Sequence, residues 1–517
     1  MQCKYALRKN RLAVTISSVL ACGVVHAGED ANIIVTTTED APIGSLTDEC
    51  TLRAAVEAAQ TESVVDGCES GQAIINIIGF DTSLANSTIT LTEGEIEIED
   101  PDTLVIRGPV DGDPSGITID GGGDSRLFNI EGGVQVGMKY MTLTNGKTVG
   151  SGYAYGGGAI RADDTILLLE QVEISNNQTD GTLAAGGGIL AIDTDLTVTD
   201  STITGNATHD SNSRGGGLML LRSQLSISRS EISDNRTNGV FAQGGGLRLS
   251  NSTATVSRTR VIGNRTDTYN SPGGGIFATD SDLTIVESTI ADNLTTQSQS
   301  SGGGIGASFS DMTVERTTIS GNRTQGSSSH GGGVFASRSD LDVRQSTVSG
   351  NSASGNGGGI YFRNPYDQDY SHRIFYSTVA FNTAVGGDGG IYHDGAETFI
   401  LRTSLVVQAE PQDSGCNKQP DKYLDSISTD AVCASVNTSL EDIALEPLAN
   451  NGGQTLTHAL AEASVAIEAG GDCETTYGIT ADQRGFPRPG LDSSQCDAGA
   501  FEAQPGDSLF RDQFIIE

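Results

Sequence analysis

Residues 273–293 read GGGIFATDSDLTIVESTIADN, and related sequences recur along the middle of the chain. Apolar residues in this stretch occupy every second position, as Leu283 and Ile285 do, and residues 331–351 repeat the pattern. This interval is typical of β-strands that bury one face, whereas a helix would require intervals of three to four. The sequence therefore predicts short strands whose same faces point inward in every copy.

Glycine triplets mark the period of the repeat. They begin at Gly156, Gly186, Gly215, Gly244, Gly273, Gly302, Gly331 and Gly357. Most successive triplets are 29 residues apart, which indicates one unit copied many times and stable only when stacked on its neighbours. A triplet in every coil favours a crowded bend over a ligand site.

Three short strands per repeat without a helical segment predict an all-β fold, a right-handed parallel β-helix of about ten coils. Each coil should add about 4.8 Å along the axis. A propeller is the alternative, but its blades need four strands and usually about 40 residues or more.

Asparagines recur at the same period and predict a structural ladder. They are Asn177, Asn206, Asn235, Asn264, Asn293, Asn322, Asn351 and Asn382. Asparagine tolerates the left-handed conformation of a sharp corner, and stacked copies can hydrogen-bond amide to amide. A hydroxyl five residues earlier, from Ser201 to Ser377, suggests a second ladder. Six of the asparagines match the Asn-x-Thr glycosylation acceptor, but their recurrence at the coil period favours turn geometry.

The N-terminus has the features of an export signal. Basic residues precede an apolar stretch at 12–25, and VHA at 25–27 supplies the small residues that a secretory peptidase reads. We expect a signal peptide at 1–27 and an exported protein, extracellular or on a bacterial cell surface. Alternatively, VLAC at 19–22 is a lipobox, and lipidation of Cys22 would make the protein an outer-membrane lipoprotein. No later apolar stretch approaches the length of a membrane span.

The chain is strongly acidic, with a formal net charge of −36. Removal of residues 1–27 leaves 26 basic and 66 acidic residues, a net charge of about −40, which argues against nucleic acid and anionic membranes as partners. We expect no cofactor. Calcium is the alternative, bound by carboxylates near Asp193 and Asp195 or near Asp280 and Asp282. Solubility of a long rod explains the same acidity.

Six cysteines lie outside the repeats and suggest disulfides in an exported chain. They are Cys50, Cys68, Cys416, Cys433, Cys473 and Cys496. Fifteen connectivities can be drawn, and pairing of each cysteine with its neighbour in the sequence is favoured because the rod would separate the two clusters. Such disulfides would staple the ends of the solenoid, where strand edges need caps.

One helix is expected, at the N-terminal end. CTLRAAV at 50–56 opens it, and Thr51 is placed as its N-cap. Its apolar face holds Leu52, Ala55, Val56 and Ala59. That face can cover the open end of the first coil.

The predicted organisation follows from these features. It consists of a signal peptide at 1–27, an N-terminal cap with the first strands at 28–100, β-helix repeats at 101–410, C-terminal coils and a stapled cap at 411–503, and a tail at 504–517.

Both ends of the chain resemble known bacterial families. CTLRAAV at 50–56 and DGC at 66–68 resemble the domain named for its Cys-Ser-Leu-Arg-Glu-Ala motif, although Ala54 stands where that family has glutamate. DQRGFPRP at 482–489 and CDAGAFE at 496–502 resemble the terminal signature of the surface proteins called choice-of-anchor Q. The repeats are similar to those of chlamydial polymorphic outer-membrane proteins. These resemblances imply a secreted or surface β-helix protein and imply no reaction.

The expected function is a non-catalytic role in adhesion or envelope interaction by a monomer, with a glycan or cell-surface component as partner. The alternative is a polysaccharide lyase or glycoside hydrolase of the pectin-degrading type, since such enzymes share this fold. A hydrolase needs paired carboxylates, and Asp163 with Asp164 is an adjacent acidic pair, although a corner explains it better. Aromatic residues between 361 and 392 could bind a sugar or stack within the last coils.

Overall fold

The protein is described by a computed structural model. The structure covers residues 31–72, 74–99, 103–109, 116–364, 370–395, 398–409, 414–473, 478–490, 493–504 and 507. The expected signal peptide, the lipidation site at Cys22 and most of the tail lie outside these residues. No helix in the described part of the chain is both long and apolar enough to cross a membrane.

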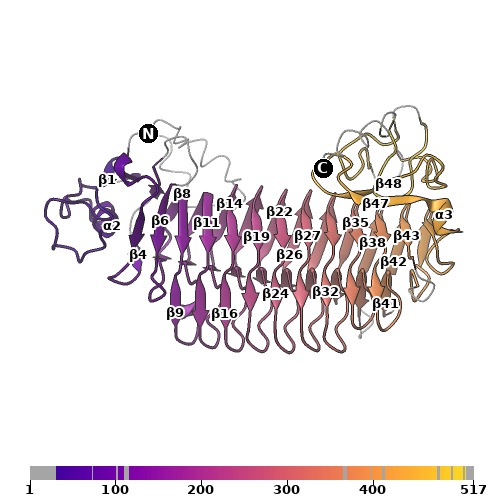
Figure 1. Ribbon diagram of the computed structural model, residues 1–517, viewed down its shortest axis with the longest axis horizontal. Helices are drawn as coiled ribbons and strands as arrows, with labels where there is room; N and C mark the ends of the chain where they lie inside the picture. The colour runs from indigo at the N-terminus through magenta and orange to yellow at the C-terminus, as the bar shows by residue number, and fades with distance from the viewer. Residues whose placement is uncertain are drawn as a thin grey trace, which may run out of the picture.

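The fold is a right-handed parallel β-helix of about 11 coils with about 29 residues per coil, which confirms the predicted fold class. The coils stack into a rod, with the N-terminal end in indigo and the C-terminal end in orange and yellow (Figure 1). Within the described residues, the coil strands form three parallel sheets that run the length of the rod.

One sheet carries the strands that follow the glycine triplets. Its strands are β4 (Ile96–Ile98), β7 (Phe128–Glu131), β10 (Ile160–Asp163), β13 (Ile189–Ile192), β17 (Leu218–Leu221), β21 (Leu247–Ser250), β25 (Ile276–Thr279), β29 (Ile305–Ser308), β33 (Val334–Ser337), β37 (Ile360–Arg363) and β41 (Ile391–Asp394).

The largest sheet has two columns of strands. The first column is β1 (Ile33–Val35), β2 (Asn76–Phe80), β5 (Thr103–Arg107), β8 (Gln135–Thr144), β11 (Ile166–Ser175), β14 (Asp195–Thr199), β18 (Gln224–Ser228), β22 (Thr253–Ser257), β26 (Asp282–Val286), β30 (Asp311–Glu315), β34 (Leu341–Arg344), β38 (Ser371–Phe375), β42 (Thr398–Arg402) and β44 (Lys422–Leu424). The second is β3 (Thr88–Thr90), β6 (Ile117–Asp120), β15 (Thr202–Thr204), β19 (Glu231–Ser233), β23 (Arg260–Ile262), β27 (Thr289–Ala291), β31 (Thr318–Ser320), β35 (Thr347–Ser349), β39 (Thr378–Ala380), β43 (Leu405–Val407), β45 (Ile427–Ser428) and β46 (Val436–Asn437).

The remaining sheet precedes the loops that lead to the next coil. Its strands are β9 (Lys147–Val149), β12 (Gln178–Asp180), β16 (Ala207–His209), β20 (Arg236–Thr237), β24 (Arg265–Thr266), β28 (Leu294–Thr295), β32 (Arg323–Thr324), β36 (Ser352–Ala353) and β40 (Thr383–Ala384). Two short 3-10 turns, Thr82–Leu84 and Tyr153–Tyr155, connect strands of the coils. Outside the coils lie α2 (Leu52–Thr61), α3 (Leu440–Ile443) and the antiparallel pair β47 (Leu445–Ala449) and β48 (Thr457–Leu460).

A regular coil has four strands, whereas the sequence predicts three. The coil that begins with β13 continues through β14, β15 and β16. Asp200 divides β14 from β15 because its φ of 49° turns the chain between them. Arg229 and Arg258 make the same left-handed turn in the next two coils, so the corner has no constant residue type in the sequence and was missed.

The interior is filled by the alternating apolar residues, as the pattern predicts. Leu283, Ile285 and Ile290 are each at most 1% exposed. They lie in register with apolar residues of the adjacent coils, as Leu283 does with Ala254 and Met312. Full burial of such a side chain contributes about 1.5–3 kcal/mol to stability.

The ladder asparagines form a continuous buried column. Nδ2 of Asn293 donates to Oδ1 of Asn322 at 2.9 Å, and the backbone N of Asn293 donates to the same oxygen at 3.0 Å. Nδ2 also donates to the carbonyl of Val261 in the preceding coil at 2.9 Å. The amide-to-amide contact recurs between neighbours from Asn177 to Asn382. Each side chain inside the column therefore links three coils.

These asparagines do not adopt the left-handed conformation that was expected of them. The residue before them does, as Asp292 with φ 56° and Gly321 with φ 66° illustrate. Because the turn comes one residue earlier, the asparagine side chain points inward and is fully buried. A glycan therefore has no access to the Asn-x-Thr sites. The threonine of the motif is buried as well, and Thr237 donates to the carbonyl of Ala242 at 2.8 Å.

Hydroxyl ladders run beside the asparagine column. The backbone N of Ser288 donates to Oγ1 of Thr317 at 3.2 Å, and this contact recurs between neighbours from Ser201 to Ser377. A further column, from Thr194 to Ser339, makes the same contacts at another corner. Both columns satisfy backbone donors at places where the strands turn.

The glycine triplets occupy crowded bends. Gly273 has a φ of 75°, which other residues rarely adopt. A Cβ on Gly274 would lie 2.4 Å from the carbonyl oxygen of Gly303 in the next coil. Steric exclusion between coils therefore accounts for the repeated triplets.

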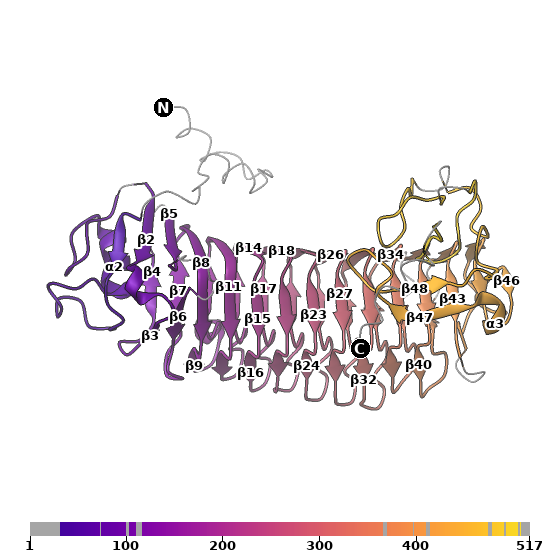
Figure 2. The same cartoon turned by 45° about the horizontal axis from the view of Figure 1, so that its top comes forward.

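Both ends of the rod are capped and cross-linked. Helix α2 contacts β1, β2 and β4 at the N-terminal end, and the Thr51 hydroxyl accepts from the backbone N of Ala54 at 3.0 Å (Figure 2). The cysteines pair locally, as Cys50–Cys68, Cys416–Cys433 and Cys473–Cys496. The first disulfide lies at the N-terminal cap and the other two lie at the C-terminal end.

Replacement of Asn293 by alanine should lower the free energy of unfolding by roughly 1–3 kcal/mol, because buried partners in two adjacent coils lose their hydrogen bonds. Thermal and denaturant unfolding would measure the loss. Arg323→Ala is the control, since Arg323 is exposed on the neighbouring coil. Equal stability of Asn293→Ala and wild type would contradict the structural role of the column.

Candidate binding groove beside the C-terminal lobe

The chain after the last coil forms a lobe that folds back over the rod. This C-terminal lobe, the described residues between 440 and 507, covers one flank of the last coils (Figures 1 and 2). It meets a column of buried threonines, Thr318, Thr347 and Thr378, which lie in register on β31, β35 and β39. The backbone N of Ala500 donates to Oγ1 of Thr378 at 3.0 Å.

Gln483 is the central contact between the lobe and the rod. Its Nε2 donates to Oγ1 of Thr318 at 2.9 Å, and its Oε1 accepts from Oγ1 of Thr347 at 2.6 Å. The same Nε2 reaches Thr455 and the carbonyl of Leu456 within the lobe, at 2.9 and 3.0 Å. Gln483 belongs to the DQRGFPRP segment, and the structure gives that segment a docking role.

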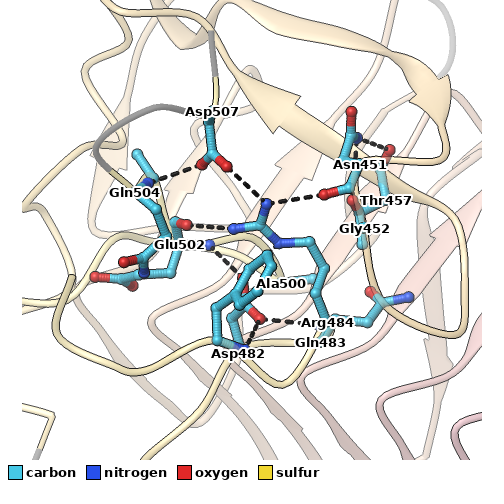
Figure 3. A network of polar contacts seen from close by, with 12 residues as sticks. Asn451, Gly452, Thr457, Asp482, Gln483, Arg484, Ala500, Glu502, Gln504 and Asp507 are labelled. Atoms are coloured by element: carbon cyan, nitrogen blue, oxygen red, sulfur yellow. Dashed lines mark hydrogen bonds and ion pairs between the residues drawn. The ribbon is translucent and has the colours of Figure 1, made fainter. Parts of the chain in front are cut away.

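Buried charges on either side of Gln483 hold the lobe in shape. Asp482 and Arg484 have fully buried side chains joined at 2.8 Å, and Arg484 also donates to the carbonyls of Glu502 and Asn451 (Figure 3). Asp482 further accepts from the backbone N of Phe486 and of Glu502. A buried ion pair whose other polar atoms are also bonded favours one geometry.

A second buried ion pair faces the rod. Arg488 donates to Glu502 at 2.9 Å and lies over the ring of Tyr376 on the last coils, 5.2 Å from its centre. Burial raises the pKa of Glu502 to about 7, against the opposing charge of Arg488. These contacts give the lobe a fixed position relative to the rod.

A groove of about 540 Å³ lies beside the lobe, on the flank of the earlier coils. Its lining residues are Asp200, Ser201, Thr202, Arg229, Ser230, Glu231, Arg258, Arg260 and Gln454. The rod supplies all of them except Gln454, which comes from the lobe. Thr202, Glu231 and Arg260 occupy the register column that continues, through Thr289, into the threonines under the lobe.

Oppositely charged residues of successive coils pair along the corner that borders the groove. Arg229 pairs with Asp200 at 2.7 Å, Arg258 with Glu287 at 2.7 Å, and Arg260 on the adjoining strand with Glu231 at 3.1 Å. Each pair joins successive coils, because each partner lies 29 residues from the other.

The arginines keep the carboxylates at this corner ionised. The hydrogen bond from Arg229 lowers the pKa of Asp200. Burial favours a higher pKa for Glu287, but the hydrogen bonds and charges of Arg258 and Arg316 outweigh it, and its pKa is lowered. A general acid would need a raised pKa, so this arrangement suits recognition of polar or charged groups.

The candidate catalytic pair, Asp163 and Asp164, lies outside the groove lining. Asp164 is a corner residue with φ 52°, in keeping with the corner interpretation. Asp163 ends β10 and forms an ion pair with Arg161. Burial raises the pKa of Asp163, and the charge of Arg161 opposes the shift.

The candidate calcium ligands are not brought into one group. Asp193 pairs with Arg222 of the next coil at 2.7 Å. Asp195 begins β14, whereas Asp280 and Asp282 lie at the same two positions three coils further along. Within the described residues no three acidic, histidine or cysteine side chains form a metal-binding cluster.

The aromatic residues Tyr361 and Phe362 lie on opposite faces of the sheet whose strands follow the glycine triplets. Tyr361 stacks on Tyr392 at 5.1 Å and on His330 at 4.5 Å between ring centres, and Tyr361 is 5% exposed. Phe362 is fully buried and stacks on His372 at 4.0 Å. Stacking within the last coils thus accounts for Tyr361 and Phe362, while Tyr366 lies outside the described residues.

The groove residues and Gln483 were missed from the sequence. Arg229 and Arg258 do recur at the 29-residue period, and this spacing was the available signal. Gln454 lies 196 residues after Arg258, and no sequence pattern indicates that it joins the groove.

Comparison with known protein families supports the fold. The family model described as "Right handed beta helix region" matches residues 115–294. A similar solved structure is titled "Crystal structure of pectate lyase Pel9A", with 14% sequence identity, a TM-score of 0.37, and coverage of 92% of this chain and 97% of the lyase chain. A search of curated proteins found no match. The likeness to the lyase is too low to argue for an activity.

Replacement of Gln483 by alanine should loosen the lobe, because buried hydroxyls of Thr318 and Thr347 lose a partner at a cost of about 1–3 kcal/mol. Amide hydrogen exchange of β48 should speed up while exchange in β25 and β26 stays unchanged. Gln495→Ala is the control, because Gln495 is an exposed glutamine of the same lobe. Unchanged protection of β48 in Gln483→Ala would show that this contact does not hold the lobe.

Proposed function

We propose that the protein is a secreted or cell-surface β-helix protein with a non-catalytic role in adhesion or envelope interaction. The signal-like N-terminus at 1–27 supports export. The end segments at 50–56 and 482–489 support a relationship to the Cys-Ser-Leu-Arg-Glu-Ala domain and to choice-of-anchor Q surface proteins.

The observation that carries the proposal is the charge pairing in the groove. Asp200 and Glu231 each pair with an arginine from the next coil. Glycoside hydrolysis needs one carboxyl group that can donate a proton and a second at a defined distance. The hydrogen bond from Arg229 lowers the pKa of Asp200, so this carboxylate is suited to binding and not to proton donation.

The regular rod also favours binding at several points. Each coil presents its outward residues in register with those of the next coil, about 4.8 Å away. A solenoid therefore offers an extended surface on which weak contacts add. The buried packing of the ends and of the lobe would keep that surface in one shape.

We expect the purified mature protein to release neither unsaturated, ultraviolet-absorbing ends nor reducing sugars from polygalacturonate, alginate or neutral glycans, with or without calcium. It should instead bind to a glycan array or to whole cells. The Asp163→Asn/Asp164→Asn variant should bind as the wild type does. Sustained product formation that disappears in this double variant would overturn the proposal and assign catalysis to the pair.

A further inference from the structure

Basic residues are concentrated in two coils of the rod that lie between acidic coils. Residues 211–265, which we name the basic belt, contain eight arginines and two acidic residues, and five of the arginines pair with carboxylates that lie outside this range in the sequence. The 55 residues before it, 156–210, contain one arginine and nine acidic residues, and the 55 after it, 266–320, contain one arginine and seven. The arginines of the belt are Arg214, Arg222, Arg229, Arg236, Arg248, Arg258, Arg260 and Arg265.

The groove lies where the belt meets the C-terminal lobe. Arg229, Arg258 and Arg260 line it, and their side chains are 51%, 55% and 64% exposed. The lining has only two carboxylates, those of Asp200 and Glu231, against three guanidinium groups. Exposed ion pairs of this kind contribute little to stability, so an incoming anion can compete for the arginines.

The chemistry of the lining fits an extended ligand with spaced anionic groups. Guanidinium groups bind carboxylate and sulfate through paired hydrogen bonds. Arg229 and Arg258 occupy the same corner of successive coils, about 4.8 Å apart along the axis. The amide of Gln454 and the hydroxyl of Thr202 add partners for sugar hydroxyls at the same place.

The width of the belt distinguishes a glycan from a nucleic acid. Two coils extend about 10 Å along the axis, and the coils on both sides are acidic. Double-stranded DNA carries one negative charge per ~1.7 Å, so a duplex would extend over the acidic coils and be repelled. A short acidic oligosaccharide, with one acidic group per sugar or per pair of sugars, can place its charges on the belt without extending over the acidic coils.

We propose that the groove binds a segment of an acidic glycan, with carboxylate or sulfate groups held by Arg229, Arg258 and Arg260. This inference rests on the proposed binding function and names the ligand class for it. The lobe contributes Gln454, and the docked position of the lobe therefore completes the site.

The test compares two arginines of the same coil. Arg229 pairs with Asp200 at 2.7 Å and lines the groove, whereas Arg222 pairs with Asp193 at 2.7 Å and lies at another corner. The two pairs are almost equally exposed. The side chains of Arg229 and Asp200 are 51% and 41% exposed, and those of Arg222 and Asp193 are 52% and 44% exposed. Arg222→Gln is therefore a matched control for Arg229→Gln, because each variant removes one positive charge and one ion pair from the same coil.

Calorimetric titration would use alginate oligosaccharides for carboxylate, heparin oligosaccharides for sulfate, dextran as the neutral glycan, and duplex DNA. We expect at least one acidic glycan to bind, more weakly at higher salt. Arg229→Gln and Arg260→Gln should each weaken that binding by about tenfold or more, because the glycan loses one charged hydrogen-bonding partner. Arg222→Gln should stay within about twofold of wild type, and thermal melting should verify that all variants fold.

Other outcomes would overturn the inference. Equal losses in Arg222→Gln and Arg229→Gln would indicate a general charge effect, and tighter binding of DNA than of any acidic glycan would indicate a different ligand class. Binding only to neutral glycans or to cells, unaffected by Arg229→Gln, would reject the groove while leaving the proposed function standing. Failure to bind any glycan or cell surface would reject both.

Discussion

Each buried asparagine inside the column bonds at once to the coil before it and the coil after it, and this contact fixes the register on which the rest of the rod depends. Asn293, for example, reaches Val261 on one side and Asn322 on the other. An amide left without these partners inside the rod would cost about 1–3 kcal/mol. Every coil must therefore place an asparagine at the same point, and the outward residues come into register as a consequence.

The register produces the two features that matter for function. One outward column presents Thr318, Thr347 and Thr378 to the C-terminal lobe, and the same column presents Glu231 and Arg260 where the lobe ends. The docking surface and the groove are thus neighbouring parts of one column, and they differ only in the residue type that each coil supplies. The buried charges around Gln483 then fix the lobe at one place on the rod.

The sequence period predicted the coils, the inward positions such as Ile285, and the asparagine column, because these features repeat in every unit. It assigned the left-handed turn to the asparagines, whereas Asp292 and its equivalents make it, since asparagine and its neighbour are both turn formers. It predicted three strands per coil because the corner at Asp200 is occupied by other residue types in the following coils, such as Arg229 and Arg258, and so leaves no repeated signal. The groove could not be predicted, because Arg229 and Gln454 meet only through the folding back of the lobe.

Native-state amide hydrogen exchange along the rod tests the role of the asparagine column most directly. The backbone amides from Asn177 to Asn351 donate to the next asparagine side chain. We predict that these amides exchange only through global unfolding, at similar rates along the rod, while loop amides exchange through local opening. Exchange of the column amides as fast as that of the loop amides would contradict the claim that the column holds the coils together.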